Sequence, residues 1–111
     1  MTTKTTEQLI QEKGLTAPRV TQQDLQDNIV SEHYFTGAEA ARIGGTEPHP
    51  LDMLTFCVLV LRNGFTVTGE SACASPENFD AELGRKIARQ NAEQKIWPLM
   101  GYHLKQQLAE A

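Results

Sequence analysis

The sequence lacks most of the features that mark common enzyme, membrane and nucleic-acid-binding proteins. Its two cysteines, Cys57 and Cys73, form no C-x-x-C pair and no zinc-ligand spacing. Its longest apolar run, residues 54–61, is far shorter than the roughly 20 residues that span a bilayer. The first residues also lack the apolar core of a secretion signal. We therefore expect a small cytoplasmic domain with two free thiols.

Basic residues are in the minority, and no known catalytic spacing is present. The chain has 14 acidic and 10 basic residues, which argues against a non-specific nucleic-acid binder. His33, His49 and His103 lie far apart, without an H-E-x-x-H pattern. Ser71 and Ser75 lack the G-x-S-x-G elbow of serine hydrolases. Because acid–base chemistry needs a positioned pair of groups, we expect no enzymatic activity, no cofactor and no metal site.

What the chain does contain is a clear hairpin signal. Asn63-Gly64 separates two segments rich in β-branched and apolar residues, at about 55–61 and 65–72. A two-residue type I′ turn there would pair Val60 with Val67 and create two different faces. The predicted core face carries Phe56, Val58, Val60, Phe65 and Val67. The other face is mixed, with Cys57, Leu59 and Leu61 opposite Thr66, Thr68 and Glu70. Since nothing in a small two-layer unit would cover this mixed face, it favours a homo-oligomer.

A helix signal lies on each side of the hairpin. A capping box at Thr21 predicts an N-terminal helix over about 22–33, although residues 31–35 either end that helix or begin an extended segment. Ser75 at the cap and Pro76 in the first turn predict a long C-terminal helix over about 76–97.

Pro98 is expected to stop or kink the long C-terminal helix, because proline removes a helical hydrogen bond. Taken together, the elements predict an α+β fold in which the hairpin is packed by that helix. We interpret residues 1–20 as a weakly structured N-terminal segment and residues 21–111 as a single domain.

The turn from Gly69 to Asn78 is the first candidate site. A helix N-terminus offers unpaired N–H groups to an anion, and nearby cations of the same helix can close over it. A simpler interpretation is that Ser75 only caps the helix, and Pro76 removes one donor. The candidate residues in this region are Ser71, Ser75, Asn78, Arg85, Lys86 and Arg89.

The aromatic segment around His33 and Tyr34 is the second candidate site. Aromatic rings can stack on a nucleobase, so these two side chains join the predicted ligand-binding set. The alternative is that Tyr34 and Phe35 pack on the core, because the chain has few other aromatic residues for it.

The stretch NGFTVTGESACASPENFDAELGRKIARQNAEQKIWPLMGYHLK, residues 63–105, resembles the gene-product-49/gene-66 family of small proteins from tailed bacteriophages and prophages. EHYFT at residues 32–36 and APRVT at residues 17–21 are also similar to this family. Met100 departs from the pattern, where an acidic residue is expected. The resemblance implies phage origin and an accessory role, and it supplies no catalytic residues.

These observations predict a phage accessory binding protein in the cytoplasm of the infected bacterium, acting against a host defence pathway. In its concrete form the protein captures a small anionic ligand, such as a nucleotide second messenger, without altering it. The alternative is a protein inhibitor that docks on a host enzyme, for example by adding a strand to a sheet edge. Neither a membrane nor a nucleic acid is an expected partner.

Overall fold

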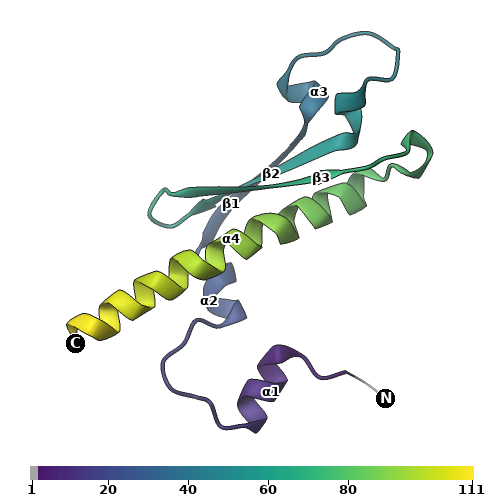
Figure 1. Ribbon diagram of the computed structural model, residues 1–111. Helices are drawn as coiled ribbons and strands as arrows, with labels where there is room; N and C mark the ends of the chain where they lie inside the picture. Colours follow the sequence, from purple (N-terminus) through teal and green to yellow (C-terminus); the bar gives the residue numbers. More distant parts are fainter. Residues whose placement is uncertain (1–2) are drawn as a thin grey trace.

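The computed structural model describes residues 3–111, and its centre is a three-stranded antiparallel sheet crossed on one face by a long helix (Figure 1). The strand order is β1-β2-β3, so β1 and β3 form the two edges. The predicted α+β fold is confirmed. The elements are α1 (Thr6–Glu12), α2 (Gln22–Asp27), β1 (Ile29–Thr36), α3 (Gly37–Ala40), η1 (Pro50–Met53), β2 (Leu54–Leu61), β3 (Thr66–Ala72), η2 (Pro76–Asn78) and α4 (Ala81–Glu110).

The hairpin turns at Asn63-Gly64 as predicted, but its loop is one residue longer. Leu61 C=O accepts from Gly64 N–H at 2.9 Å, and Leu61 N–H donates to Phe65 C=O at 2.8 Å. Within this loop only Gly64 has a positive φ, of 89°, so Asn63 does not adopt the second positive φ that a type I′ turn requires. The result is a three-residue loop. It pairs Leu59, instead of Val60, with Val67.

This register shift makes the predicted core face wrong. A shift of one residue in one strand moves its side chains to the opposite face of the sheet. The face toward α4 carries Cys57, Leu59, Leu61 and Val67, all buried, whereas Val58 and Val60 are half-buried on the other face and Phe65 is 56% exposed. Of the mixed face that was expected to need a partner, α4 therefore covers Cys57, Leu59 and Leu61. Its β3 residues Thr66, Thr68 and Glu70 lie on the open face of the sheet and are exposed.

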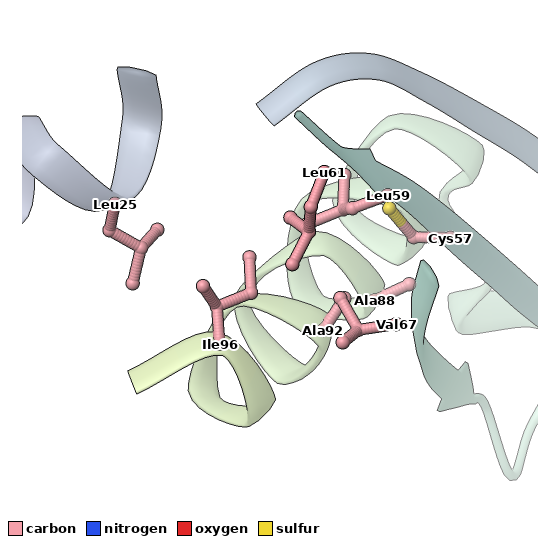
Figure 2. Close-up of a cluster of buried hydrophobic side chains, with 8 residues drawn as sticks. All are labelled: Leu25, Cys57, Leu59, Leu61, Val67, Ala88, Ala92 and Ile96. Carbon is pink, nitrogen blue, oxygen red and sulfur yellow. The ribbon is translucent and has the colours of Figure 1, made fainter. Parts of the chain in front are cut away.

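The hydrophobic core lies between β2, β3 and α4 (Figure 2). Ala88, Ala92 and Ile96 recur every four residues along α4 and are fully buried against the sheet. Leu25 of α2 lies at the Ile96 end of this cluster and is also fully buried. Small alanines in the middle of the helix let α4 approach β3 closely, which holds the two layers together.

The predicted helix over 22–33 is shorter and is followed by a strand. The Thr21 capping box is confirmed, since Asp24 N–H donates to Thr21 Oγ1 at 3.0 Å. However, α2 ends at Asp27, and residues 29–36 pair with β2. The β-branched and aromatic residues of this segment suit a strand better than a helix. Of the two alternatives for residues 31–35, the extended one is correct.

The long helix starts later and ends later than predicted. Ser75 makes no side-chain cap, because residues 76–78 form the 3₁₀ turn η2 and Phe79 is extended. Asp80, an equally strong capping residue, accepts from Leu83 N–H at 3.0 Å and begins α4.

Pro98 does not end α4, which continues to Glu110. The carbonyl that loses its partner belongs to Gln94, and both Gln94 and Pro98 are exposed, so water can satisfy that carbonyl. Buried Ile96 on the opposite side holds this turn against the sheet.

The N-terminal segment contains α1, which ends before Gly14 with its positive φ of 66°. Arg19 reaches back to Glu7 with two hydrogen bonds, one of 2.8 Å and one of 2.5 Å. Among the described residues, no helix is long and apolar enough to cross a membrane.

Candidate functional site

A small pocket lies between the end of β1 and the first turns of α4, and we call it the Tyr34 pocket. Its volume is about 250 Å³. Tyr34 and Arg85, both predicted ligand-binding residues, reach it from two elements that are distant in sequence. The complete lining is Tyr34, Phe35, Thr36, Glu39, Thr55, Phe79, Ala81 and Arg85.

Local packing fixes the walls of the Tyr34 pocket. Thr55 is the first buried residue of β2 and is only 3% exposed. Gly84 brings α4 close to it, since a Cβ on Gly84 would lie 3.0 Å from Thr55 Oγ1. Tyr34 lies beside Cys57 in the β1–β2 register, on the face toward α4. The pocket thus combines hydroxyl groups with the aromatic rings of Phe35 and Phe79.

Arg85 is the cation of this pocket that is available to a ligand. Within residues 3–111 it has no ion-pair partner. Two nearby carboxylates are held in place by backbone donors but keep their negative charge: Glu39 accepts from Thr36 N–H at 3.2 Å, and Asp80 caps α4. The first turn of α4, to which Ala81 belongs, adds N–H groups and partial positive charge. This arrangement can receive a small anionic group.

Arg89, in contrast, is occupied by the protein itself. It pairs with Glu32 of β1, lies 3.2 Å from Glu93 Oε1, and donates to Gln26 Oε1 at 2.8 Å. Burial alone would disfavour the charged guanidinium, but a hydrogen bond with Tyr34 and the attraction of both carboxylates raise the pKa of Arg89. Arg89, although predicted to bind a ligand, therefore links α4 to α2 and β1 within the protein.

The other predicted residues do not join the Tyr34 pocket. His33 alternates with Tyr34 along β1 and faces away from α4, with its ring nitrogen Nε2 3.1 Å from Ser31 Oγ. Lys86 is exposed on α4, outside the pocket lining. Ser75 is the N-cap residue of η2, and Asn78 is its last residue. Both were expected at the N-terminus of the long helix, but they precede it, because α4 begins at Ala81.

Ser71 has an indirect relation to the pocket. It pairs with Thr55 across the β2–β3 ladder and is half-buried. It contributes no lining atom to the pocket. Ser71 and Ser75, which were predicted to bind an anion at the helix start, therefore do not lie together in the Tyr34 pocket.

Six of the eight lining residues were absent from the predicted ligand-binding set: Phe35, Thr36, Glu39, Thr55, Phe79 and Ala81. Thr55 could have been found as the single polar residue in the apolar run 54–61. Thr36 is the N-cap residue of α3, where its Oγ1 accepts from Glu39 N–H at 3.1 Å. Phe79 has no local signal that separates it from an ordinary core residue. Its place in the pocket depends on the helix starting at Ala81.

Next to the pocket, the buried thiol of Cys57 makes stability sensitive to alkaline pH. Burial raises its pKa above the ordinary 9.0, and burial also raises the pKa of Tyr34. In the unfolded chain both groups ionise at lower pH than in the folded protein. Their contribution is therefore complete below about pH 9 and is lost as pH rises through the folded pKa values.

We expect the free energy of unfolding, measured by urea titration, to fall between about pH 9 and about pH 11. This range surrounds the ordinary pKa values of a thiol and a phenol. In the variant Cys57→Ala only Tyr34 still contributes to this pH dependence, so its free energy of unfolding should fall less steeply with pH. Equal slopes for the two proteins would contradict the assignment to Cys57.

A second, larger hollow lies at the other end of the molecule, and we call it the end groove. Its volume is about 750 Å³, and it runs between α2, the hairpin tip and the C-terminal half of α4. Its apolar lining is Val20, Leu61, Phe65, Leu99, Met100 and Leu104. Its polar lining is Arg19, Asp24, Asp27, Asn28, Arg62, Asn63, His103 and Gln107.

No group of three or more metal-binding side chains gathers in the described part of the chain.

Comparison with known proteins places the chain in a family. No curated protein and no solved structure matches the sequence. The model of the Phage protein (N4 Gp49/phage Sf6 gene 66) family matches residues 20–108, which include every predicted site residue and all lining of the Tyr34 pocket. The chain therefore belongs to the Phage protein (N4 Gp49/phage Sf6 gene 66) family.

Proposed function

We propose that this phage accessory protein captures a small anionic ligand in the Tyr34 pocket without altering it. The proposal rests on the guanidinium of Arg85, which has no ion-pair partner within residues 3–111 and lies at a pocket with hydroxyl groups and the start of α4. A guanidinium can bind a phosphate oxygen pair through two parallel hydrogen bonds. Thr36 and Thr55 supply hydroxyls that can donate to the same oxygens, whereas the Tyr34 hydroxyl already donates to Glu32 Oε1 at 3.4 Å.

The ligand class that best fits is a nucleotide second messenger of a host defence pathway. The pocket of about 250 Å³ admits a phosphoryl group, while the aromatic side chains of Phe35 and Phe79 can contact a base at its mouth. Capture in the cytoplasm of the infected bacterium would lower the free concentration of the messenger. The protein would thus oppose defence by sequestration alone.

Isothermal calorimetry against inorganic phosphate, the common mononucleotides and cyclic mono- and dinucleotides tests the proposal. We expect at least one nucleotide to bind with one site per chain. Arg85→Gln should weaken this binding at least about tenfold, because a charged hydrogen bond contributes about 1.5–3 kcal/mol. Arg42→Gln is the matched control, since Arg42 is an exposed arginine outside both the Tyr34 pocket and the end groove.

Two outcomes would contradict the proposal. One is no heat from any of these compounds at concentrations of about 100 μM with an intact fold. The other is equal weakening by both arginine variants, which would place binding outside the Tyr34 pocket. Chromatography of the nucleotides after incubation tests the absence of catalysis, and a converted nucleotide would reject capture without alteration.

A second candidate function is inhibition of a host enzyme by strand addition. It is favoured by β1, an eight-residue edge strand that in the described part of the chain pairs only with β2. The unpaired backbone groups of such an edge can bind an extended segment of a partner. A pull-down from host lysate separates the two functions, since a ligand trap recovers no stoichiometric protein. We also propose that the chain self-associates.

A further inference from the structure

The Tyr34 pocket holds two opposite charges that do not pair with each other. Arg85 belongs to α4 and Glu39 belongs to α3, and both side chains line the pocket. Within residues 3–111, no ion pair joins either of them to another charged group. The pocket is therefore polarised, with a cation on the α4 side and a carboxylate on the α3 side. A ligand that fills it must carry an anionic group and, at a different place, hydrogen-bond donors.

The carboxylate of Glu39 is held in a fixed position. Thr36 N–H donates to Glu39 Oε1 at 3.2 Å, and Glu39 N–H donates to Thr36 Oγ1 at 3.1 Å, which completes a capping box. The short helix α3 is itself anchored, because Gly37 and Ala38 are buried and a Cβ on Gly37 would lie 3.2 Å from Leu51 Cδ2. A carboxylate has about four acceptor positions, so Oε2 and a lone pair of Oε1 remain for a ligand.

A fixed carboxylate discriminates between nucleobases. Guanine presents two adjacent donors on one edge, the ring N1–H and the exocyclic N2 amine, and these can donate to the two oxygens of one carboxylate. Adenine and cytosine present an acceptor nitrogen beside their amino group, and uracil presents one N–H between two carbonyl oxygens. A carboxylate oxygen placed against such an acceptor is repelled and loses its hydrogen bond.

From these observations we infer that the captured ligand is a guanine nucleotide, with a phosphate at Arg85 and with N1–H and the N2 amine of guanine donating to Glu39. This assignment rests on the proposed capture at the Tyr34 pocket, and it adds the identity of the base. The charge of Glu39 accounts for the choice of a nucleotide over a bare anion. It repels free phosphate, whereas it attracts the donors of guanine.

Phe79 supplies the ring on which the base stacks. Phe35 already stacks on Phe56, with ring centroids 5.5 Å apart. Phe79 is half-buried, and a Cβ on Gly84 would lie 3.9 Å from its Cε2, so the missing side chain of Gly84 leaves room for the ring against α4. Stacking on an aromatic ring tolerates every base, so the selection of guanine is left to Glu39.

Calorimetry with the 5′-monophosphates of guanosine, inosine and adenosine tests the assignment. Inosine monophosphate differs from the guanosine compound only by lacking the N2 amine. We expect it to bind about tenfold more weakly, because one hydrogen bond to a charged group is lost. Adenosine monophosphate should bind at least about a hundredfold more weakly, since it also places an acceptor against Glu39. The cyclic dinucleotides of guanine and adenine are compared in the same way.

Glu39→Gln separates base selection from a structural role. Glutamine also completes a capping box, so circular dichroism should show an unchanged fold. The variant should bind the guanosine and adenosine compounds within about threefold of each other, because the amide has a single acceptor oxygen and its NH₂ group faces the guanine donors. Glu82→Gln is the matched control. Glu82 is an exposed carboxylate in the first turn of α4, outside the pocket lining, and its removal should leave the preference for guanine intact.

The possible failures are distinguishable. Equal binding of guanine and adenine nucleotides, still weakened by Arg85→Gln, would overturn the selection of guanine and leave ligand capture standing. A Glu39→Gln variant that keeps the full preference for guanine would overturn the role of Glu39. Binding of no nucleotide at all would overturn both the assignment and the proposed capture.

Discussion

Gly69→Ala should destabilise the protein more than any other single substitution considered. A Cβ at this position would lie 2.2 Å from the backbone oxygen of Ala88 and 2.3 Å from the backbone nitrogen of Ala92. Both atoms belong to the main chain of α4, so neither can rotate away as a side chain would. We expect the free energy of unfolding to fall by about 3 kcal/mol or more, measured by urea denaturation.

The matched control is Gly101→Ala, on the same helix but beyond the sheet. A Cβ there meets nothing within 4 Å. Because glycine costs about 0.5–1 kcal/mol relative to alanine inside a helix, this variant should be more stable than the wild type. If both glycine variants lost similar stability, the close contact between β3 and α4 would be wrong.

Leu59→Ala should give the second large effect, a loss of about 2–5 kcal/mol. Leu59 is fully buried against α4, and its removal leaves a cavity between the sheet and the helix. The surrounding alanines of α4 are too small to fill this cavity. Urea denaturation of the wild type and of Leu59→Ala measures this loss directly when the free energy of unfolding depends on urea concentration with the same slope in both proteins. Thermal denaturation is an alternative measurement.

Val60→Ala is the control that tests the register of the hairpin. Val60 follows Leu59 in β2 but is half-buried on the face away from α4. Its truncation should cost about 1 kcal/mol, mainly through lost strand preference and partial burial. A larger loss for Val60 than for Leu59 would support the two-residue turn and contradict the observed faces.

The difference between predicted and observed faces comes from one backbone angle. Asn-Gly predicts a hairpin correctly, but the dipeptide fits two loops, one with positive φ at both residues and one with positive φ at glycine alone. Asn63 takes the second, with its side-chain oxygen accepting from Phe65 N–H at 2.9 Å. The resulting shift was not predicted, because β2 has apolar residues on both of its faces.

The helix boundaries differ from prediction for a similar reason. Ser75 and Asp80 are both good capping residues five positions apart, and local preference does not choose between them. Packing of Phe79 into the Tyr34 pocket accompanies the later start. At the other end, Pro98 lies on the exposed side of α4, where the missing hydrogen bond can be replaced by water.

For the candidate site, residue chemistry was predictable but assembly was not. Arg85 and Tyr34 were predicted from charge and aromaticity, and they line one pocket. The same reasoning selected Arg89, which the fold uses to join Glu32 and Glu93. Which arginine stays free depends on the partners across α4 and β1. That pairing becomes visible only when β1 is known to be a strand.

Mass spectrometry of heat-released material from protein purified out of infected cells is the sharpest test of ligand capture at Arg85. We expect the wild type to release an intact anionic small molecule, close to one per chain, and Arg85→Gln to release little or none. An empty wild type from cells with an active defence response, or equal release from both proteins, would contradict ligand capture at Arg85.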